Sequence, residues 1–283
     1  MENNGIEYSN PTVILMQETG LGVAEIAART CYDSFDFSEN GSVLQFNKDV
    51  DDNKLPEQLQ YSIDRVNEIE HSELLDTLAW THFHHSILEH ANLSYLIKGT
   101  SRGVLQEHAR HRIQAISVRS TRYTMSSVIN AFVVSRMKND YGWFEETIKS
   151  LDLFVTTCPL YNGFQITDIW NKMSYQYNQM DPLDFVKLSI SKSSLDYVYS
   201  TEPIGIKYQL LQDGKKKRNV GDAFKHVVND NWKVDMVVTM NLRALKNYFN
   251  LRDSGAAYFQ IRELAKQMKE QTPKKYLDLI VKD

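Results

Sequence analysis

Apolar residues recur along this chain with two different periods, and the order in which these periods alternate is the strongest constraint on its fold. Short runs such as PTVILM and MVVTM are typical of buried strands, whereas longer segments repeat apolar side chains every three or four residues, as amphipathic helices do. The regular strand–helix–strand order of a doubly wound sheet is missing, so the sequence predicts an α+β fold. Strands are expected at 11–16, 93–97, 128–135 and 236–240; helices are expected at 23–35, 56–69, 71–79, 101–108, 244–252 and 255–271, with two or three more in 141–200.

Two stretches carry little of this periodicity. The polar and acidic residues 36–56 favour a loop or an irregular insertion, and the run DGKKKR at 213–218 is typical of a solvated turn or hinge. The helix expected at 23–35 places Val23, Ile26, Ala27 and Cys31 on one face, which we expect to be buried.

Composition excludes several classes of protein. A net charge of −4 disfavours a general nucleic-acid binder, and apolar runs stay well short of the roughly 20 residues that cross a bilayer. Only two cysteines are present, Cys31 and Cys158, far apart and without the spacing of a disulfide framework or a zinc ribbon. With a polar N-terminus that lacks a signal peptide's apolar segment, these features predict a cytoplasmic protein without membrane or nucleic-acid partners.

The most basic stretch runs from Arg110 to Tyr123 and reads RHRIQAISVRSTRY. Four arginines stand beside small hydroxyl side chains, and no acidic residue interrupts them. Guanidinium groups donate paired hydrogen bonds to phosphate and other planar anions, so this stretch is a candidate phosphate or nucleotide site. A solvated basic loop and a nucleic-acid-binding module are the alternatives. The Gly-rich dinucleotide fingerprint and the P-loop are both missing, so a nucleotide or flavin would be held by arginines and amides.

Two further clusters carry chemistry. The segment HFHHSILEH, from His82 to His90, offers imidazoles and a carboxylate that are potential metal ligands, although the HEXXH spacing is missing. Structural histidines and histidines lining a cofactor pocket are the other interpretations. Near the end of the chain, Asn241, Arg243, Asn247 and Arg252 stand at the start and along one predicted helix, where they are suited to bind a heterocycle's carbonyls or a phosphate.

Taken together, these clusters resemble one family, the flavin-dependent thymidylate synthases. Arg110-His111-Arg112 followed by seven residues and Ser120 has the family's signature spacing, and Arg122-Tyr123 matches its SxRY ending. HHSILEH is similar to the family's HxTPFEH, AARTCY to its AAR-x-S/C segment, and NLRALKNYFNLR to its NxRxxxNFxxLR. The four matches occur in the family's order. The resemblance implies a single catalytic domain over 1–283 with a mixed sheet flanked by helices, expanded around 36–56 and 130–220.

The resemblance also implies an activity. Such enzymes methylate dUMP to dTMP: methylenetetrahydrofolate supplies the carbon, and bound FAD, reduced by NADPH, provides the hydride. They are typically homotetramers with shared active sites, and no metal is required. Catalytic roles would belong to Arg252, Ser120 and His84. The implied flavin contacts are Cys31, Ser86, Glu89, Arg110, His111, Arg112, Ile113, Asn241, Arg243 and Asn247; the implied nucleotide contacts are Glu107, Arg110, Arg119, Ser120, Thr121, Arg122, Lys225 and Arg252.

The sequence departs from the family's pattern on the nucleotide side. Glu107 stands where a glutamine is usual, and Ser117-Val118 replace an Asn-Glu pair. Lys225 replaces a phosphate-binding arginine, which keeps the charge and loses the bidentate fork. These changes keep an alternative open, namely flavin-dependent one-carbon modification of a different pyrimidine nucleotide. A metal-dependent hydrolase that uses the His82–His90 cluster is the more distant alternative.

Overall fold

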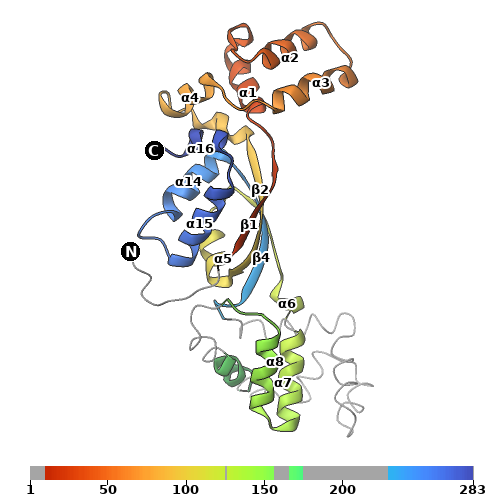
Figure 1. The fold of residues 1–283 in the computed structure, drawn as a ribbon, viewed down its shortest axis with the longest axis vertical. Coiled ribbons are helices and arrows are strands. Elements are labelled where there is room, and N and C mark those ends of the chain that lie inside the picture. The colour runs from red at the N-terminus through yellow and green to blue at the C-terminus, as the bar shows by residue number, and fades with distance from the viewer. Residues whose placement is uncertain (1–9, 125, 156–165, 175–228, 283) are drawn as a thin grey trace. The chain divides into compact units, whose positions relative to one another are not determined.

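The computed structural model describes residues 10–124, 126–155, 166–174 and 229–282 (Figure 1). The chain forms two compact units. One comprises 10–100, 104–118 and 235–283, and contains nearly all of the sheet; the other comprises 1–9, 101–103 and 119–234. Among the described residues, no helix is long and apolar enough to cross a membrane.

The first unit is built on a four-stranded sheet with the order β1-β2-β4-β3. The strands are β1 (Thr12–Glu18), β2 (Asn92–Ser101), β3 (Ala115–Val118) and β4 (Lys233–Asn241). β1 pairs antiparallel with β2, with Val13 opposite Ile97, and β3 pairs antiparallel with β4, with Ile116 opposite Val238. The α+β prediction is confirmed. Both pairs are antiparallel, whereas the resemblance implied a mixed sheet; short motif matches identify residues and do not give the direction of neighbouring strands.

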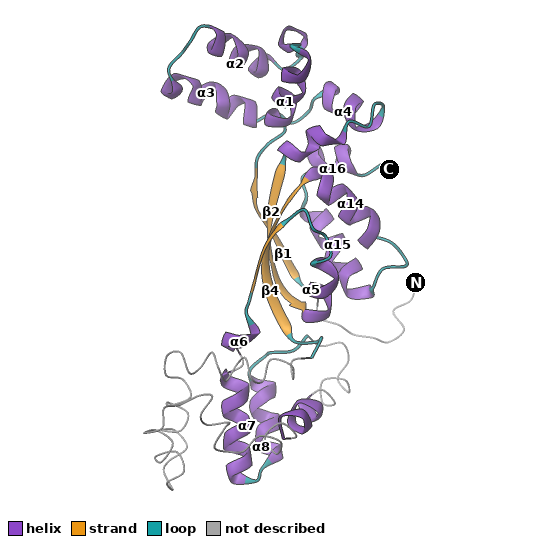
Figure 2. Cartoon of the chain, turned by 180° about the vertical axis from the view of Figure 1, so that it is seen from behind, coloured by secondary structure: helices purple, strands orange, loops and turns teal. Residues whose placement is uncertain are grey.

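Helices cover one face of this sheet (Figures 1 and 2). They are α5 (Arg102–His108), α14 (Leu242–Arg252), α15 (Phe259–Gln271) and α16 (Lys274–Ile280). Alternate residues of the central strands are buried, as period-two patterning requires; on β2 these are Leu93, Tyr95 and Ile97. The Tyr95 hydroxyl lies 2.8 Å from that of Thr272, which ties the middle of the sheet to the end of α15. On β1 and β4, Met16 and Val237 are exposed.

α14 follows β4 without an intervening loop. The strand ends at Asn241, and the Asn241 side-chain oxygen accepts a 2.8 Å hydrogen bond from the backbone N–H of Ala244, which makes Asn241 the N-cap of the helix. Leu242, Leu245 and Phe249 anchor the helix in the core. This junction fixes the direction in which α14 carries its polar side chains.

The residues before β2 form helices α1 (Gly22–Tyr32), α2 (Gly41–Asp51), α3 (Pro56–Asn67) and α4 (Glu73–Trp80), with short 3-10 turns at Phe35–Phe37 (η1) and His85–His90 (η2). The loop or irregular insertion expected at 36–56 is wrong, because about half of this stretch is the regular helix α2. Few apolar residues of α2 are buried, so its periodicity is weak. Its buried Asp49 instead accepts hydrogen bonds from Gln45, Lys54 and, on α3, Ser62.

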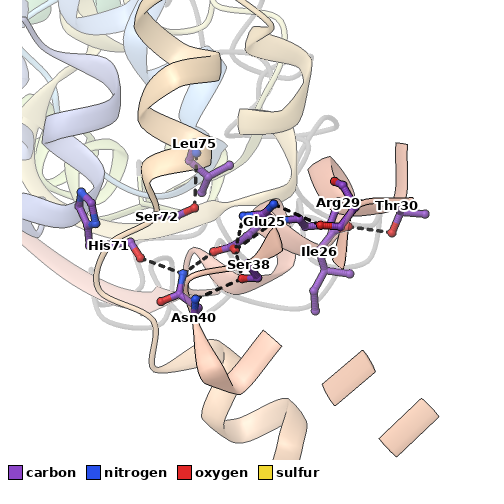
Figure 3. A network of polar contacts seen from close by, with 10 residues as sticks. Glu25, Ile26, Arg29, Thr30, Ser38, Asn40, His71, Ser72 and Leu75 are labelled. Atoms are coloured by element: carbon purple, nitrogen blue, oxygen red, sulfur yellow. Dashed lines mark hydrogen bonds and ion pairs between the residues drawn. The ribbon is translucent and has the colours of Figure 1, made fainter. Parts of the chain in front are cut away.

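The buried face of α1 also differs from the expectation. Val23 and Cys31 are exposed, whereas the neighbouring face, which includes Glu25 and Arg29, is buried. Figure 3 shows why a charged residue is tolerated there: the Glu25 carboxylate accepts hydrogen bonds of 2.6 Å from both Ser38 Oγ and Asn40 Nδ2. Arg29 Nη2 adds a third donor at 3.5 Å, while the buried Nε of Arg29 has no hydrogen-bond partner. Periodicity places apolar residues inward and cannot detect a charge that is buried with its partners.

In the second unit, α6 (Thr121–Thr124) leads into α7 (Ser126–Lys138), which packs on α8 (Tyr141–Ser150); residues 166–174 are also helical. The strand expected at 128–135 is wrong, because this run lies inside α7. Val128, Ala131 and Phe132 are buried at helical spacing, and a short apolar run has no period that separates a buried helix from a strand. The turn expected at 213–218 and most of the 130–220 expansion lie outside the described residues.

Candidate active site

The polar site of the first unit forms where the end of α5 meets the end of α14. α5 ends at His108, and the chain then turns through residues 109–114 before entering β3. The Gln114 side-chain amide closes this turn, because its Nε2 donates hydrogen bonds to the backbone carbonyls of His108 at 3.0 Å and His111 at 2.7 Å. The turn presents the first half of the basic stretch toward the last turn of α14.

Arg252, in the last turn of α14, is the centre of the site. Its Nε donates to His111 Nε2 at 2.9 Å, its Nη1 donates to a Glu107 carboxylate oxygen at 2.9 Å, and its Nη2 donates to the Glu107 backbone carbonyl at 3.0 Å. The Arg252 side chain is only 14% exposed. A guanidinium has five N–H donors, so contacts with these two residues engage three and leave two for a ligand.

These contacts define the protonation of His111. Because Arg252 donates to His111 Nε2, that nitrogen has a free lone pair, and the neutral ring carries its proton on Nδ1. Partial burial lowers the pKa of His111, and the positive charges of Arg252 and then Arg110 lower it further, while Glu107 opposes them. His111 and Arg252 together therefore offer N–H donors to a ligand.

A buried histidine–tyrosine pair supports His111 from behind. His108 Nδ1 lies 3.1 Å from the Tyr248 hydroxyl, and the Tyr248 ring meets both imidazoles edge-on, with centroids 5.1 Å from His108 and 4.8 Å from His111. Burial, followed by the charge of His111, lowers the pKa of His108 to about 4, so it stays neutral at pH 7. Burial raises the pKa of Tyr248. The pair forms a rigid, uncharged wall.

Glu107 connects this buried cluster to an exposed arginine. Besides Arg252, its carboxylate accepts contacts of 3.3–3.4 Å from Arg110 Nη1. The Arg110 side chain is 72% exposed, in contrast to that of Arg252. The Glu107 carboxylate therefore bridges Arg110 and Arg252, and its negative charge offsets part of the positive charge of each.

A second polar group forms where η2 meets the start of α14. Arg243 Nη1 lies 2.5 Å from Glu89 Oε1, and both side chains are exposed. One turn further along α14, the Lys246 ammonium lies 3.9 Å from the centroid of the Trp80 ring and 3.2 Å from His85 Nε2. Burial lowers the pKa of Lys246. The structure thus brings together two segments that are about 150 residues apart in sequence.

The His82–His90 cluster does not converge. The rings of His82 and His84 are tilted against each other at 5.9 Å, both residues are exposed, and His85 Nε2 lies 3.0 Å from the backbone carbonyl of Ala79. Across the described parts of the chain, no group of three or more histidine, cysteine or acidic side chains is placed to hold a metal. The metal-dependent hydrolase therefore gains no support from these residues.

The remaining site residues predicted from the sequence make no contact with the Arg252 cluster among those described above. Asn241 caps α14, as described above, so its side-chain oxygen already has a structural partner. Exposed side chains that this structure leaves available to a ligand are those of Cys31, Ser86, Arg112, Ile113 and Asn247. Arg119, Ser120, Thr121 and Arg122 belong to the second unit, and Lys225 lies outside the described residues.

Sequence reasoning missed His108, Tyr248 and Lys246. Two of them had a usable signal: Tyr248 precedes Arg252 by four residues, one helical turn, and His108 precedes His111 by three. An apolar or aromatic residue at helical spacing is normally read as core, and Tyr248 is indeed core as well as a partner of the site. Lys246 had no such signal, because its contacts with Trp80 and His85 are made only in the folded chain.

The fold and the donor-rich site define an α+β protein equipped to bind an anion or a carbonyl-rich heterocycle. Comparison with known proteins then gives the family. The profile of the family described as thymidylate synthase complementing protein matches residues 13–276, and the chain belongs to this family. The resemblance drawn from the sequence motifs is confirmed.

Full-length relatives agree with this assignment. The flavin-dependent thymidylate synthase of Wolinella succinogenes is 29% identical over 265 residues, which cover 94% of this chain and 95% of the relative. That of Helicobacter pylori is 25% identical over 92% of this chain and 93% of its own length. The crystal structure of thymidylate synthase X from Helicobacter pylori, with FAD and dUMP, superposes with a TM-score of 0.57 at 23% identity, covering 96% of this chain and 97% of the other. It shows that the fold is shared.

Proposed function

We propose that this protein is a flavin-dependent thymidylate synthase that converts dUMP to dTMP. In this reaction methylenetetrahydrofolate supplies the carbon, and FAD reduced by NADPH is the cofactor. The observation that carries the proposal is the family match over 13–276, which spans every described residue of the site. The relative of known structure that shares the fold contains FAD and dUMP, the same two ligands.

The donor set fits a flavin. A flavin ring system presents carbonyl and ring-nitrogen acceptors on an apolar plane, and it supplies the hydride when bound. Exposed N–H donors of Arg112, Arg243 and Asn247 and the exposed Ile113 side chain are suited to that combination. His111 adds its Nδ1–H. We propose that these side chains, with Cys31, Ser86, Glu89, Arg110 and Asn241, hold the FAD.

Arg252 is suited to the pyrimidine. Its two remaining N–H groups can donate to a uracil carbonyl and to N3 as the ring ionises, and a guanidinium held in place at that point stabilises the developing negative charge. Electron density then moves toward C5, where the new carbon bond forms, without a cysteine nucleophile. We propose that His84 and Ser120 assist the reaction, and that the nucleotide is held by Glu107, Arg110, Arg119, Ser120, Thr121, Arg122, Lys225 and Arg252.

We also propose that both compact units act as one catalytic domain, and that the protein works in the cytoplasm as a homotetramer with shared active sites. The exposed apolar side chains on the open face of the sheet, including Ile14, Met16 and Val237, support self-association. Light scattering of the purified protein tests the tetramer; a monomer at micromolar concentration contradicts it.

One observation fits a second candidate equally well, the modification of a different pyrimidine nucleotide. The Glu107 carboxylate beside the Arg252 guanidinium places an acceptor next to a donor. That pair complements the N4 amine and N3 of cytosine as well as O4 and N3–H of uracil. The substrate is therefore decided by assay.

The experiment is a spectrum followed by a substrate comparison. We expect the purified protein to be yellow, or to become so with FAD, and to form dTMP from dUMP with methylenetetrahydrofolate and NADPH. dUMP, dCMP and UMP are assayed side by side with mass analysis of the products. Protein that FAD cannot reconstitute would reject the proposal, and turnover of dCMP alone would transfer it to the second candidate.

A further inference from the structure

The contacts of Arg252 depend on one neighbour more than on any other. Of its three hydrogen bonds, two are made to Glu107, one to the carboxylate and one to the backbone carbonyl. The third is made to His111 Nε2. A planar guanidinium that is fixed by three acceptors has little rotational freedom left, so the directions of its two remaining N–H groups, one on each Nη, are set by the protein.

This arrangement couples Glu107 to His111 through Arg252. His111 accepts from Arg252 only while Arg252 keeps its orientation, and Glu107 sets that orientation. The same side chain also affects the charge of the site. Arg252 and Arg110 are positive, Glu107 is negative and His111 is neutral, so the cluster carries one net positive charge, where an uncharged side chain at 107 would leave two.

We propose that Glu107 is a positioning and specificity-determining residue of this site: it orients Arg252, keeps the His111 proton on Nδ1 through Arg252, and limits the site to one positive charge. This inference deepens the proposed function, on which its nucleotide readout rests. Its tautomer readout is made on the ligand-free protein and stands independently of dUMP turnover.

Glu107→Gln and Glu107→Ala separate the two roles. Glutamine keeps an acceptor for Arg252 and removes the charge, so E107Q retains orientation and binds the anionic nucleotide more tightly; we expect the Kd for dUMP to fall by about threefold to tenfold at low salt, with a steeper salt dependence. Alanine removes the side-chain acceptor and leaves Arg252 with the backbone carbonyl of residue 107 and His111, so the guanidinium is held less firmly. For E107A we expect kcat to fall by about 100-fold, because a misdirected catalytic group loses about that factor, with a smaller change in KM.

The direct readout is ¹⁵N NMR of the histidine rings in protein labelled at histidine, with His111 identified by its loss in H111Q. We expect the Nδ1–H tautomer of His111 in the wild type and in E107Q, and a mixture with Nε2–H in E107A. The matched control is Glu68→Gln, whose carboxylate lies 3.8 Å from the Arg65 guanidinium on an exposed surface and which leaves both readouts unchanged. Unfolding curves verify that each variant is folded, and E107Q carries the test if E107A does not fold.

Two results would overturn the inference. One is a wild-type His111 that carries its proton on Nε2, since that ring cannot accept from Arg252. The other is a folded E107A with the wild-type tautomer and wild-type kcat, since Glu107 would then position nothing. If the wild type shows the Nδ1–H tautomer and E107A loses it, but neither protein turns over dUMP, the positioning role stands and the proposed substrate is rejected.

Discussion

Glu25 and Glu107 each accept hydrogen bonds from an arginine of their own unit, yet the two clusters differ in how deeply they are buried. The Glu25 side chain is 1% exposed and Arg29 is 8% exposed; Ser38, Asn40 and Arg29 all direct donors at the Glu25 carboxylate (Figure 3). The Glu107–Arg252 pair is 32% and 14% exposed, and Arg252 retains two donors without a protein partner among the described residues.

The difference shows that the family's motifs contain residues with a structural role as well as residues that a ligand can reach. The segment AARTCY contributes Arg29 inward, to a cluster that ties α1 to the turn before α2, and Cys31 outward, where a ligand can reach it. The segment RHR contributes to a cluster that is left incomplete. The Glu25 carboxylate, buried and engaged by three donors, stabilises the fold, even though the buried Nε of Arg29 has no hydrogen-bond partner. The more exposed Arg252 keeps donors that a ligand can reach.

The largest effect is expected at the buried Glu25 cluster. Glu25→Ala leaves the Arg29 guanidinium buried without its carboxylate, so the free energy of unfolding should fall by about 3–5 kcal/mol. Urea unfolding followed by circular dichroism measures it. The matched control is Glu68→Ala, where the carboxylate is 71% exposed and we expect a change below about 1 kcal/mol. Equal losses in the two variants would mean that the Glu25 cluster is not structural.

The incomplete cluster should show its largest effect in activity. Arg252→Lys keeps the charge and loses the planar fork, so kcat/KM for dUMP should fall by about 100-fold, as for the loss of one oriented donor in an active site. Steady-state kinetics measure this. Arg65→Lys, at an arginine that is 58% exposed, serves as the control. An R252K protein that is as active as the wild type, or that loses as much stability as E25A, would remove the distinction between the clusters.

The buried wall behind His111 predicts a pH dependence of stability. The pKa of His108 is about 4 in the folded protein and 6.5 as its ordinary value, so between these pH values the unfolded chain binds a proton that the folded protein does not. Stability therefore falls as the pH falls, by about 2 kcal/mol between pH 7.5 and pH 5. Unfolding at the two pH values measures it. His108→Gln should remove most of this slope; an unchanged slope would assign it to other groups.

The smallest effect is expected at the hydrogen bond inside that wall. Tyr248→Phe keeps the ring packed against both imidazoles and removes the hydroxyl that pairs with His108, so the free energy of unfolding should fall by about 1 kcal/mol. Thermal or urea unfolding detects it, with Tyr61→Phe, at a 69% exposed tyrosine, as the neutral reference. A Y248F protein that is more stable than the wild type would show that burying the hydroxyl costs more free energy than its hydrogen bond to His108 returns.

Much of the fold could be predicted from apolar period alone, where that period is strong. Residues 12–16, 93–97 and 236–240 of the expected strands lie in β1, β2 and β4, and the pattern from Pro56 is α3. The failures share a physical cause. The run at 128–135 is apolar on several sides and has no period to measure, α2 is stabilised by polar contacts to α3, and the four-residue β3 is too short to show an alternation.

The sequence could name several residues of the candidate site, but it could not show which of them contact each other. Motif spacing identified Arg110, His111 and Arg252, and the structure brings His111 and Arg252 into contact. Spacing could not show that Glu107 reaches Arg252 across 145 residues of sequence, nor that Asn241 has its oxygen committed to a helix cap. Those contacts depend on how α5 and α14 are placed by the sheet.

Because α14 follows β4 directly, this site should tolerate substitutions in α14 better than insertions or deletions. Each residue added to or removed from a helix turns everything beyond it by about 100° and moves it by about 1.5 Å. With Asn241 fixed as the cap at the end of a strand, a single-residue deletion between it and Arg252 would swing the guanidinium away from Glu107 and His111. We therefore expect a substitution at an exposed position such as Asn250 to disturb the site less than any change in the eleven-residue length of the helix.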